Sequence, residues 1–314
     1  MGDHELTTDI GWIGDVQILD DRMESLVSPQ SNLRRHGGHG QWTEGPVYLP
    51  ASDTVIWSDI PNNVIMSWTD GIMGVWRSPS NFTNGHTLDH EGRIIHCSHG
   101  ARAVLRTEHD GSVTTLVDRH KGGRLNSPND VVVKSDGTIW FTDPPYGILS
   151  NREGYKADSE QEGCFVFRLD PVSGELSAVI TDMVHPNGLA FSVDESLLYV
   201  SDTSQGFFGD TGDFHIRVYN VVDGVSTAHG RGFVRIADGL SDGFRLDTHG
   251  NIYTSAADAI YVISPDGTTI GRIPVPERIS NCCWGGPERR TLFITASTGL
   301  YSIDLLASDG RTAS

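Results

Sequence analysis

The chain has 314 residues, of which 37% are hydrophobic and 20% are charged, a composition typical of a globular protein with a sizeable core. Its formal net charge of −18 argues against nucleic acid as a partner, because the phosphate backbone would be repelled. No apolar run is long enough to span a membrane, and the acidic N-terminus lacks the basic and apolar regions of a signal peptide.

Short strand-like runs that end in an aromatic or branched cluster recur six times along the chain. In order they are TVIWSD (54–59), RIIHCSH (93–99), TIWFTD (138–143), LLYVSD (197–202), NIYTSA (251–256) and TLFITA (291–296). A turn and another short strand precede each run, and most are followed by a third and fourth strand. Such spacing, between 39 and 59 positions from copy to copy, is typical of a β-propeller with four strands per blade.

The sequence therefore predicts an all-β fold, a six-bladed β-propeller formed by residues 41–314 as a single domain. A β-sandwich is the alternative, but it would not produce six matched copies. Residues 1–40 fall outside the repeats. We expect part of them, such as SNLRRH (31–36), to add an outer strand to the last blade and close the ring.

A polar residue opens the first strand of every copy. In chain order these are Glu44, Asn84, Asn129, Asn187, Asp242 and Asn281. The second strand ends 14 or 15 positions after each of them, so the six are in register. Because first strands line the channel and second strands run antiparallel to them, all six are expected at one mouth of the channel. We call these six residues the ring.

Turn chemistry alone is a competing explanation for the ring, since Asn-Gly and Asp-Gly form turns readily. Six oxygen-bearing residues in one register, with the poor turn former Glu44 among them, favour a ligand set instead. Two carboxylates with amide oxygens suit a hard cation such as Ca²⁺ or Mg²⁺, and a roomy ring of many ligands favours calcium. We therefore expect a metal ion in the central channel.

At these residues the sequence resembles the gluconolactonase and senescence-marker-protein (regucalcin) family, which also includes a diisopropylfluorophosphatase. The matching motifs, which run from residue 42 to about 300, include WTEGPVY, RLNSPNDVVVKSDGTIWFTDPPYGI, HPNGLAFSVDESLLYVSD, SDGFRLDTHGNIY and NCCWGG. NSPNDVV with TDPPYGI is specific to the gluconolactonase-like branch. The resemblance implies a six-bladed propeller with one divalent ion held by Glu44, Asn129, Asn187 and Asp242, four members of the ring. Ser127 stands where regucalcin-like members have an arginine that holds sugar hydroxyls, a departure that concerns the substrate.

The resemblance implies a carboxylic ester hydrolase, a lactonase that opens a lactone ring, in the simplest case that of a sugar (aldono-) lactone. The ion would polarise the carbonyl while a carboxylate assists the attacking water. The resemblance points to Asp242 as this base, and Asp130 is a second candidate. Substrate contacts are expected from Asn84, His99, Arg102 and Tyr146, with Phe207 and Phe208 as walls.

Several alternatives stay open on sequence grounds. The cation could be Mg²⁺, Mn²⁺, Zn²⁺ or Fe²⁺ in place of Ca²⁺. The same fold could act on a non-sugar lactone, a phosphotriester or a secondary metabolite, or could bind calcium without turnover. The four cysteines lack C-x-x-C spacing and look like thiols of a reducing compartment, which indicates a cytoplasmic protein. We expect a small-molecule lactone as the partner, and neither nucleic acid nor a membrane; the sequence does not indicate the oligomeric state.

Overall fold

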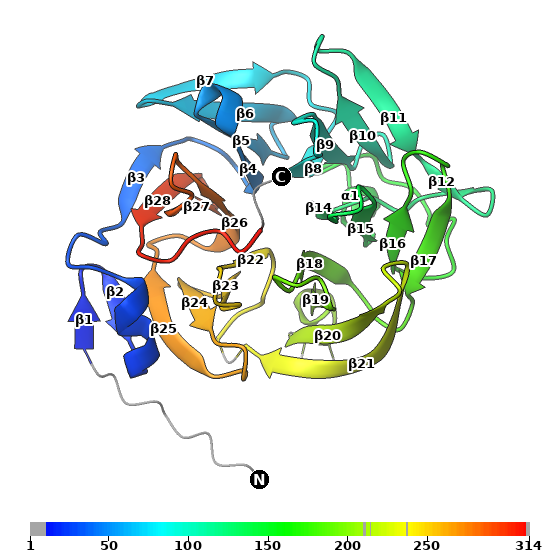
Figure 1. The fold of residues 1–314 in the computed structure, drawn as a ribbon. Helices are drawn as coiled ribbons and strands as arrows, with labels where there is room; N and C mark the ends of the chain where they lie inside the picture. The colour runs from blue at the N-terminus through cyan, green and yellow to red at the C-terminus, as the bar shows by residue number, and fades with distance from the viewer. Residues whose placement is uncertain (1–10, 210–211, 214, 237, 312–314) are drawn as a thin grey trace.

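The computed structural model describes residues 11–209, 212–213, 215–236 and 238–311. Their strands form six antiparallel sheets around a central channel, which confirms the predicted all-β six-bladed propeller (Figure 1). First strands of neighbouring blades contact one another all around the ring, so they line the channel. Residues 1–10, where we expected no signal peptide, lie outside the described residues. In the described part of the chain, no helix is long and apolar enough to cross a membrane.

Each blade has four strands, which follow one another from the channel outward. Blade 1 comprises β4 (Thr43–Leu49), β5 (Thr54–Asp59), β6 (Val64–Thr69) and β7 (Ile72–Arg77), and blade 2 comprises β8 (Thr83–Leu88), β9 (Ile94–Ser98), β10 (Ala103–Thr107) and β11 (Val113–Val117). Blade 3 comprises β14 (Val131–Val133), β15 (Ile139–Asp143), β16 (Phe165–Leu169) and β17 (Leu176–Ile180), and blade 4 comprises β18 (Pro186–Phe191), β19 (Leu197–Asp202), β20 (His215–Val222) and β21 (Ser226–Arg235). Blade 5 comprises β22 (Phe244–Leu246), β23 (Ile252–Ser255), β24 (Ala259–Ile263) and β25 (Thr269–Pro274), and blade 6 comprises β26 (Ile279–Gly285), β27 (Thr291–Ala296), β28 (Gly299–Asp304) and β3 (Arg34–Gly37).

A few short elements lie outside the blades. They are the 3-10 helices η1 (Asp21–Leu26) and η2 (Pro50–Ser52), the hairpin β12 (Arg119–His120) with β13 (Gly123–Arg124), and the helices α1 (Tyr146–Leu149) and α2 (Gln205–Phe208). The two α-helices follow the second strands of blades 3 and 4. They therefore lie at the same end of those blades as the ring.

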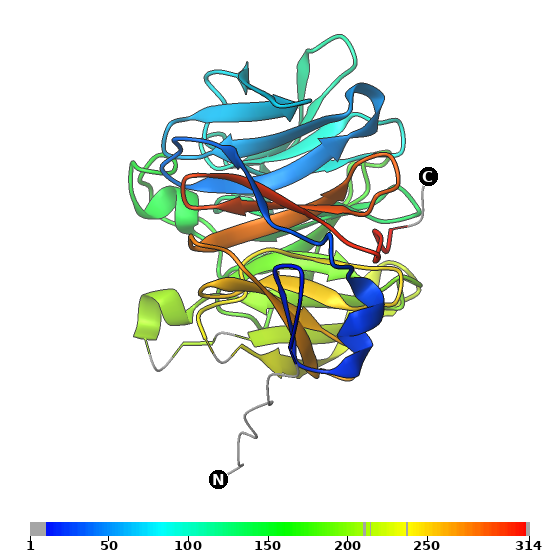
Figure 2. The ribbon, with the colours of Figure 1, turned by 90° about the vertical axis from the view of Figure 1, so that its left-hand side faces the viewer.

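The N-terminal segment joins two blades. Strand β3 pairs antiparallel with β28, so the sixth blade takes its outer strand from the start of the chain, as Figure 2 shows in blue beside red. A hairpin of β1 (Gly11–Ile13) and β2 (Val16–Ile18) pairs with β25 and widens blade 5. No pattern in the sequence predicted this hairpin. The two pairings tie the beginning of the chain to its last two blades.

Aromatic residues of the second strands fill the spaces between blades. Trp57 packs with Phe293 of blade 6, and Trp140 packs with Leu189 of blade 4. Both tryptophans are at most 1% exposed. A buried aromatic side chain removes roughly 150–250 Å² of surface from water, so these contacts are a large part of what holds neighbouring blades together. Packing between blades fixes the relative positions of the inner strands that carry the ring.

Candidate active site

The ring residues stand where the inner strands begin. Glu44 pairs with Ser58 and Asn281 with Thr295, each close to the end of a second strand. Asn129 and Asp242 lie two residues before their inner strands β14 and β22. Just after the ring residue, the pairing between the first and second strands shifts register by a β-bulge, as it does between Glu44 and Val47. The ring residues are therefore at equivalent places, at one mouth of the channel.

Hydroxyl groups on the second strands hold the ring backbone of the next blade. Ser58 Oγ donates to the Asn84 carbonyl at 2.9 Å, and Thr142 Oγ1 donates to the Asn187 carbonyl at 2.7 Å. Ser201 Oγ donates to the Asp242 carbonyl, also at 2.7 Å. The same kind of bond thus links blade 1 to 2, 3 to 4 and 4 to 5. It fixes the ring backbone independently of any ligand.

A cavity of about 310 Å³ opens at this mouth. Its lining comprises Trp42, Glu44, Ile60, Asn84, His99, Asn129, Tyr146, Arg152, Glu153, Asn187, Thr203, Gly206, Phe207, Leu240, Asp242, Ala256, Arg278 and Ile279. Five of the six ring residues line it. The sixth, Asn281, does not line it, and its Oδ1 accepts from the Cys282 backbone at 2.8 Å.

Glu44 and Asp242 form a coupled pair of carboxyl groups. Both side chains line the cavity, and they lie close enough for each to affect the pKa of the other. Burial raises the pKa of Glu44 well above its usual range, and the charge of Asp242 raises it further. Burial likewise raises the pKa of Asp242, with the charge of Asp130 as the next cause. Without a cation, the pair therefore holds a proton that a typical carboxyl pair would release.

These donors fit a hard divalent cation. Two carboxyl groups and the amides of Asn129 and Asn187 face one cavity, and all offer oxygen. Among the described residues no group of three or more His, Cys, Asp and Glu side chains is placed to hold a metal ion, so a cation at the ring would need the two amides as well as the two carboxyl groups. In the absence of a cation, protons must offset the negative charge of these two carboxyl groups. A bound cation would offset that charge instead.

His99 lies in the cavity wall and orients Asn84. His99 Nδ1 is 3.0 Å from the Glu153 carbonyl, which can only accept, so this nitrogen carries the hydrogen. The other nitrogen, Nε2, then accepts from the Asn84 amide at 3.3 Å. Burial lowers the pKa of His99 to about 4, so its imidazole is neutral at pH 7. This arrangement leaves the amide oxygen of Asn84 to face the cavity.

Tyr146 and Phe207 form an aromatic wall from α1 and α2. Their rings are stacked, with centroids 5.4 Å apart. The Tyr146 hydroxyl hydrogen-bonds to Thr203 Oγ1, which also accepts from the Asn187 amide at 3.1 Å. Phe208, which we expected as a second wall, is 54% exposed and does not line the cavity.

Two residues predicted from sequence lie outside the cavity. Arg102 turns away: its Nε donates to the Leu125 carbonyl at 2.7 Å, and its Nη1 lies 3.3 Å from Glu160. Its guanidinium therefore holds loops together instead of reaching a substrate. Asp130 lies in the channel, 1% exposed and paired with Arg245. The Asp130 carboxylate is thus engaged in an ion pair and does not line the cavity.

Sequence reasoning missed several residues that line the cavity. Arg152 and Glu153 belong to the long segment after β15, where only Tyr146 was singled out. Arg278 lies three residues before Asn281, and comparing all positions at that offset from the ring could have found it. Ser127 stands where regucalcin-like members have an arginine. Its hydroxyl donates to the Pro144 carbonyl at 2.6 Å and so supports the start of the segment that follows β15.

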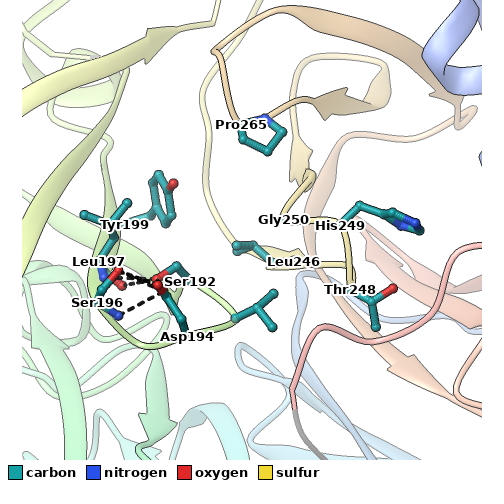
Figure 3. A pocket seen from close by; sticks show the side chains of 11 residues that line it. Ser192, Asp194, Ser196, Leu197, Tyr199, Leu246, Thr248, His249, Gly250 and Pro265 are labelled. Carbon is teal, nitrogen blue, oxygen red and sulfur yellow. Dashed lines mark hydrogen bonds between the residues drawn. The ribbon is translucent and has the colours of Figure 1, made fainter.

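A larger cavity, of about 570 Å³, lies between blades 4 and 5 at the opposite ends of the inner strands (Figure 3). It is lined mainly by turn residues, among them Asp194 and His249. Asp194 accepts hydrogen bonds from Ser192 and Ser196, so its charge is already satisfied within its own turn. Lacking paired acids, it is a weaker candidate than the ring cavity despite its size.

Comparisons with known proteins give the family of the chain. Residues 42–298 match the SMP-30/Gluconolactonase/LRE-like region. A gluconolactonase from Zymomonas mobilis is 32% identical over 316 aligned positions, covering 93% of this chain and 86% of that protein. The structure of a gluconolactonase from Xanthomonas campestris is 36% identical with a TM-score of 0.86, covering 93% of this chain and 96% of that one. A calcium-binding regucalcin from Agrobacterium tumefaciens shares the fold at 18% identity with a TM-score of 0.72, over 90% of this chain and 96% of that one.

Proposed function

The chain belongs to the SMP-30/gluconolactonase/LRE-like family, and from this premise we propose that it is a divalent-cation-dependent lactonase acting on a sugar lactone. The observation that carries the proposal is the buried carboxyl pair Glu44–Asp242 beside two ring amides in one small cavity. Relatives that are named gluconolactonases support the reaction class. A cavity of about 310 Å³ suits a small substrate such as a single sugar ring.

Glu44, Asn129, Asn187 and Asp242 would hold the cation. Calcium is the first choice, because it accepts many oxygen ligands in flexible geometry and tolerates neutral amide oxygens. Mg²⁺ and the transition metals Mn²⁺, Zn²⁺ and Fe²⁺ are the alternatives to compare with it. When bound, the cation would supply a Lewis acid that polarises the lactone carbonyl.

Asp242 is the proton acceptor in this proposal. It is partly accessible from the cavity, whereas Glu44 is only 4% exposed and accepts from the Gly45 backbone at 3.0 Å. Asp242 takes a proton from the water that attacks the carbonyl carbon. This proton then goes to the oxygen of the lactone ring as the C–O bond breaks. The product is the open hydroxy acid. Asp130 is the weaker candidate for this role, because it pairs with Arg245.

The substrate would be oriented by Asn84, His99 and Tyr146. The Asn84 amide, oriented by neutral His99, offers hydrogen bonds to sugar hydroxyls, and the Tyr146–Phe207 wall offers an apolar face to the sugar ring. Because the four cysteines are free thiols, we also propose a cytoplasmic location.

A panel of aldono-lactones and aliphatic lactones, assayed with and without EDTA, tests the proposal. We expect ring opening that EDTA abolishes and added Ca²⁺ restores. Absence of activity on every lactone, while calorimetry still detects Ca²⁺ binding, would refute the lactonase assignment and favour a binding protein. An Asp242→Asn variant that binds Ca²⁺ weakly or normally but shows unchanged turnover would remove Asp242 as the base.

A further inference from the structure

The charges that line the cavity do not balance. Besides neutral His99, five charged side chains line it: Glu44, Arg152, Glu153, Asp242 and Arg278. Arg152 lies 3.6 Å from its neighbour Glu153, so these two charges offset each other. A divalent cation would offset the two ring carboxylates. Arg278 is then the one charge left without a counterpart.

The Arg278 guanidinium has no partner among the residues that the structure describes. Its neighbour Glu277 is engaged elsewhere: the Tyr301 hydroxyl donates to it at 2.6 Å, and the Thr298 backbone donates at 2.7 Å. The Arg278 backbone is nevertheless fixed, because its carbonyl accepts from Ser297 at 2.8 Å. An exposed side chain on an anchored backbone thus stands at the rim of the cavity.

Arg278 pairs with no described acid, although the chain has 41 acidic residues against 23 Lys and Arg. Arginine recognises carboxylate, phosphate and sulfonate groups through two parallel hydrogen bonds, and such charge-assisted bonds are stronger than neutral ones. Arg278 enters from the connection to blade 6, whereas Glu153 enters from blade 3 on the opposite side of the ring. Since Arg152 offsets the charge of Glu153 on that side, a negative group on the substrate would be attracted toward Arg278.

We propose that the preferred lactone carries one anionic substituent, bound by Arg278 at the blade 6 side of the mouth. This inference rests on the proposed lactonase function and specifies its substrate class. The lactone carbonyl would lie beside the six ring residues of the protein. The anionic substituent would lie at the end of the substrate remote from this carbonyl. A carboxylate, a phosphate and a sulfonate share the required chemistry.

Equilibrium binding tests the inference without turnover. The probes are 1,5-anhydroglucitol, which has no carbonyl to hydrolyse, and its 6-phosphate and 6-carboxylate derivatives, titrated by calorimetry into the Ca²⁺-loaded protein. We expect the charged probes to bind roughly 10- to 100-fold more tightly than the neutral one. The tighter of the two charged probes identifies which anionic group fits.

Arg278→Gln should remove most of this preference, and Arg278→Lys should restore part of it. Arg290→Gln is the matched control: Arg290 pairs with Glu288 at 3.5 Å on the turn after β26, so the variant makes the same change in net charge far from the cavity. It should keep the preference. A preference that survives in Arg278→Gln, or an equal loss of affinity for charged and neutral probes, overturns the inference.

Steady-state kinetics provide a second, independent test of the anion site. The ratio of kcat/KM for a 6-phosphorylated aldono-lactone to that for the neutral lactone should fall at least tenfold in Arg278→Gln. If no lactone is hydrolysed, the proposed function fails but the binding result still decides the anion site. If lactones are hydrolysed and the ratio does not change, only the anion site fails.

Discussion

Asp130 Oδ2 lies 3.3 Å from Arg245 Nη1, and this ion pair joins blade 3 to blade 5 inside the channel. The two side chains are 1% and 8% exposed. Asp130 follows the ring residue Asn129, and Arg245 follows Asp242 by three positions. Arg245 Nη1 also donates to the Phe244 carbonyl at 2.7 Å. The pair therefore spans the channel between two proposed ligand strands.

Breaking this pair should strongly destabilise the fold. Arg245→Met leaves the Asp130 carboxylate buried without a counter-charge, and we expect a loss of roughly 3–5 kcal/mol in the free energy of unfolding. The double variant Asp130→Asn/Arg245→Met should recover much of that loss, since no charge is then left unpaired. Urea unfolding of the two single variants and the double variant measures the coupling. The exposed pair Arg290–Glu288 serves as the control, because Glu288→Gln should change stability by less than about 1 kcal/mol. A double variant no more stable than Arg245→Met would contradict this account.

Without a cation, the contribution of the Glu44–Asp242 pair to stability should decrease as the pH rises. Burial raises the pKa of Asp242 to about 7 and that of Glu44 well above its usual range. Carboxyl groups of the unfolded chain titrate near pH 4. Between pH 4 and about pH 7 these two groups therefore bind more protons in the folded protein than in the unfolded chain, so their contribution to the free energy of unfolding falls with rising pH. We expect this fall in EDTA, on the order of a few kcal/mol, from melting curves at several pH values.

Saturating Ca²⁺ should remove the part of this pH dependence that belongs to the Glu44–Asp242 pair, because a bound cation keeps both groups ionised. Burial also raises the pKa of Asp143 to about 7, and its contribution should persist with the cation present. The difference between the two pH profiles thus isolates the pair. Identical slopes with EDTA and with Ca²⁺ would show that the pair does not take up the ion.

Register explains how much of the site the sequence revealed. The interval between Glu44 and Asp59 recurs in every copy, and this interval alone placed six polar residues at one mouth. Arg245 was not found, because nothing in a strand sequence says which distant acid a side chain will meet. Glu153 and Arg278 lie in connections between strands, where no repeat fixes the backbone. Arg102 was misjudged for the same reason: its φ of +54° and its bonds to Leu125 and Asn126 depend on a loop 23 or 24 positions away.

His99 should act as a positioning residue for Asn84. His99→Leu removes both the acceptor for the Asn84 amide and the donor to the Glu153 carbonyl, so we expect KM for the lactone to rise about tenfold. His99→Gln offers one donor and one acceptor and should recover most of the loss. Calorimetry should give the same Ca²⁺ affinity for all three proteins, since His99 is not among the proposed ligands. A KM equally impaired in His99→Gln and His99→Leu would show that the imidazole itself contacts the substrate.

Gly188 should be essential for the ring, through steric contact alone. A Cβ at this position would lie 2.2 Å from the Asp242 carbonyl oxygen, which already accepts from the Gly188 backbone at 3.1 Å. Gly188→Ala must therefore push Asp242 away from Asn187 and Glu44, and we expect Ca²⁺ affinity to fall at least tenfold and stability to fall by roughly 1–3 kcal/mol. Gly232→Ala in β21 is the matched control, because its Cβ would meet nothing within 4 Å. Neither glycine has a left-handed φ, so backbone strain does not distinguish the two variants. Calorimetric Ca²⁺ titration and urea unfolding of both variants make the comparison, and normal Ca²⁺ affinity in a folded Gly188→Ala protein would mean that Asp242 does not depend on this close approach.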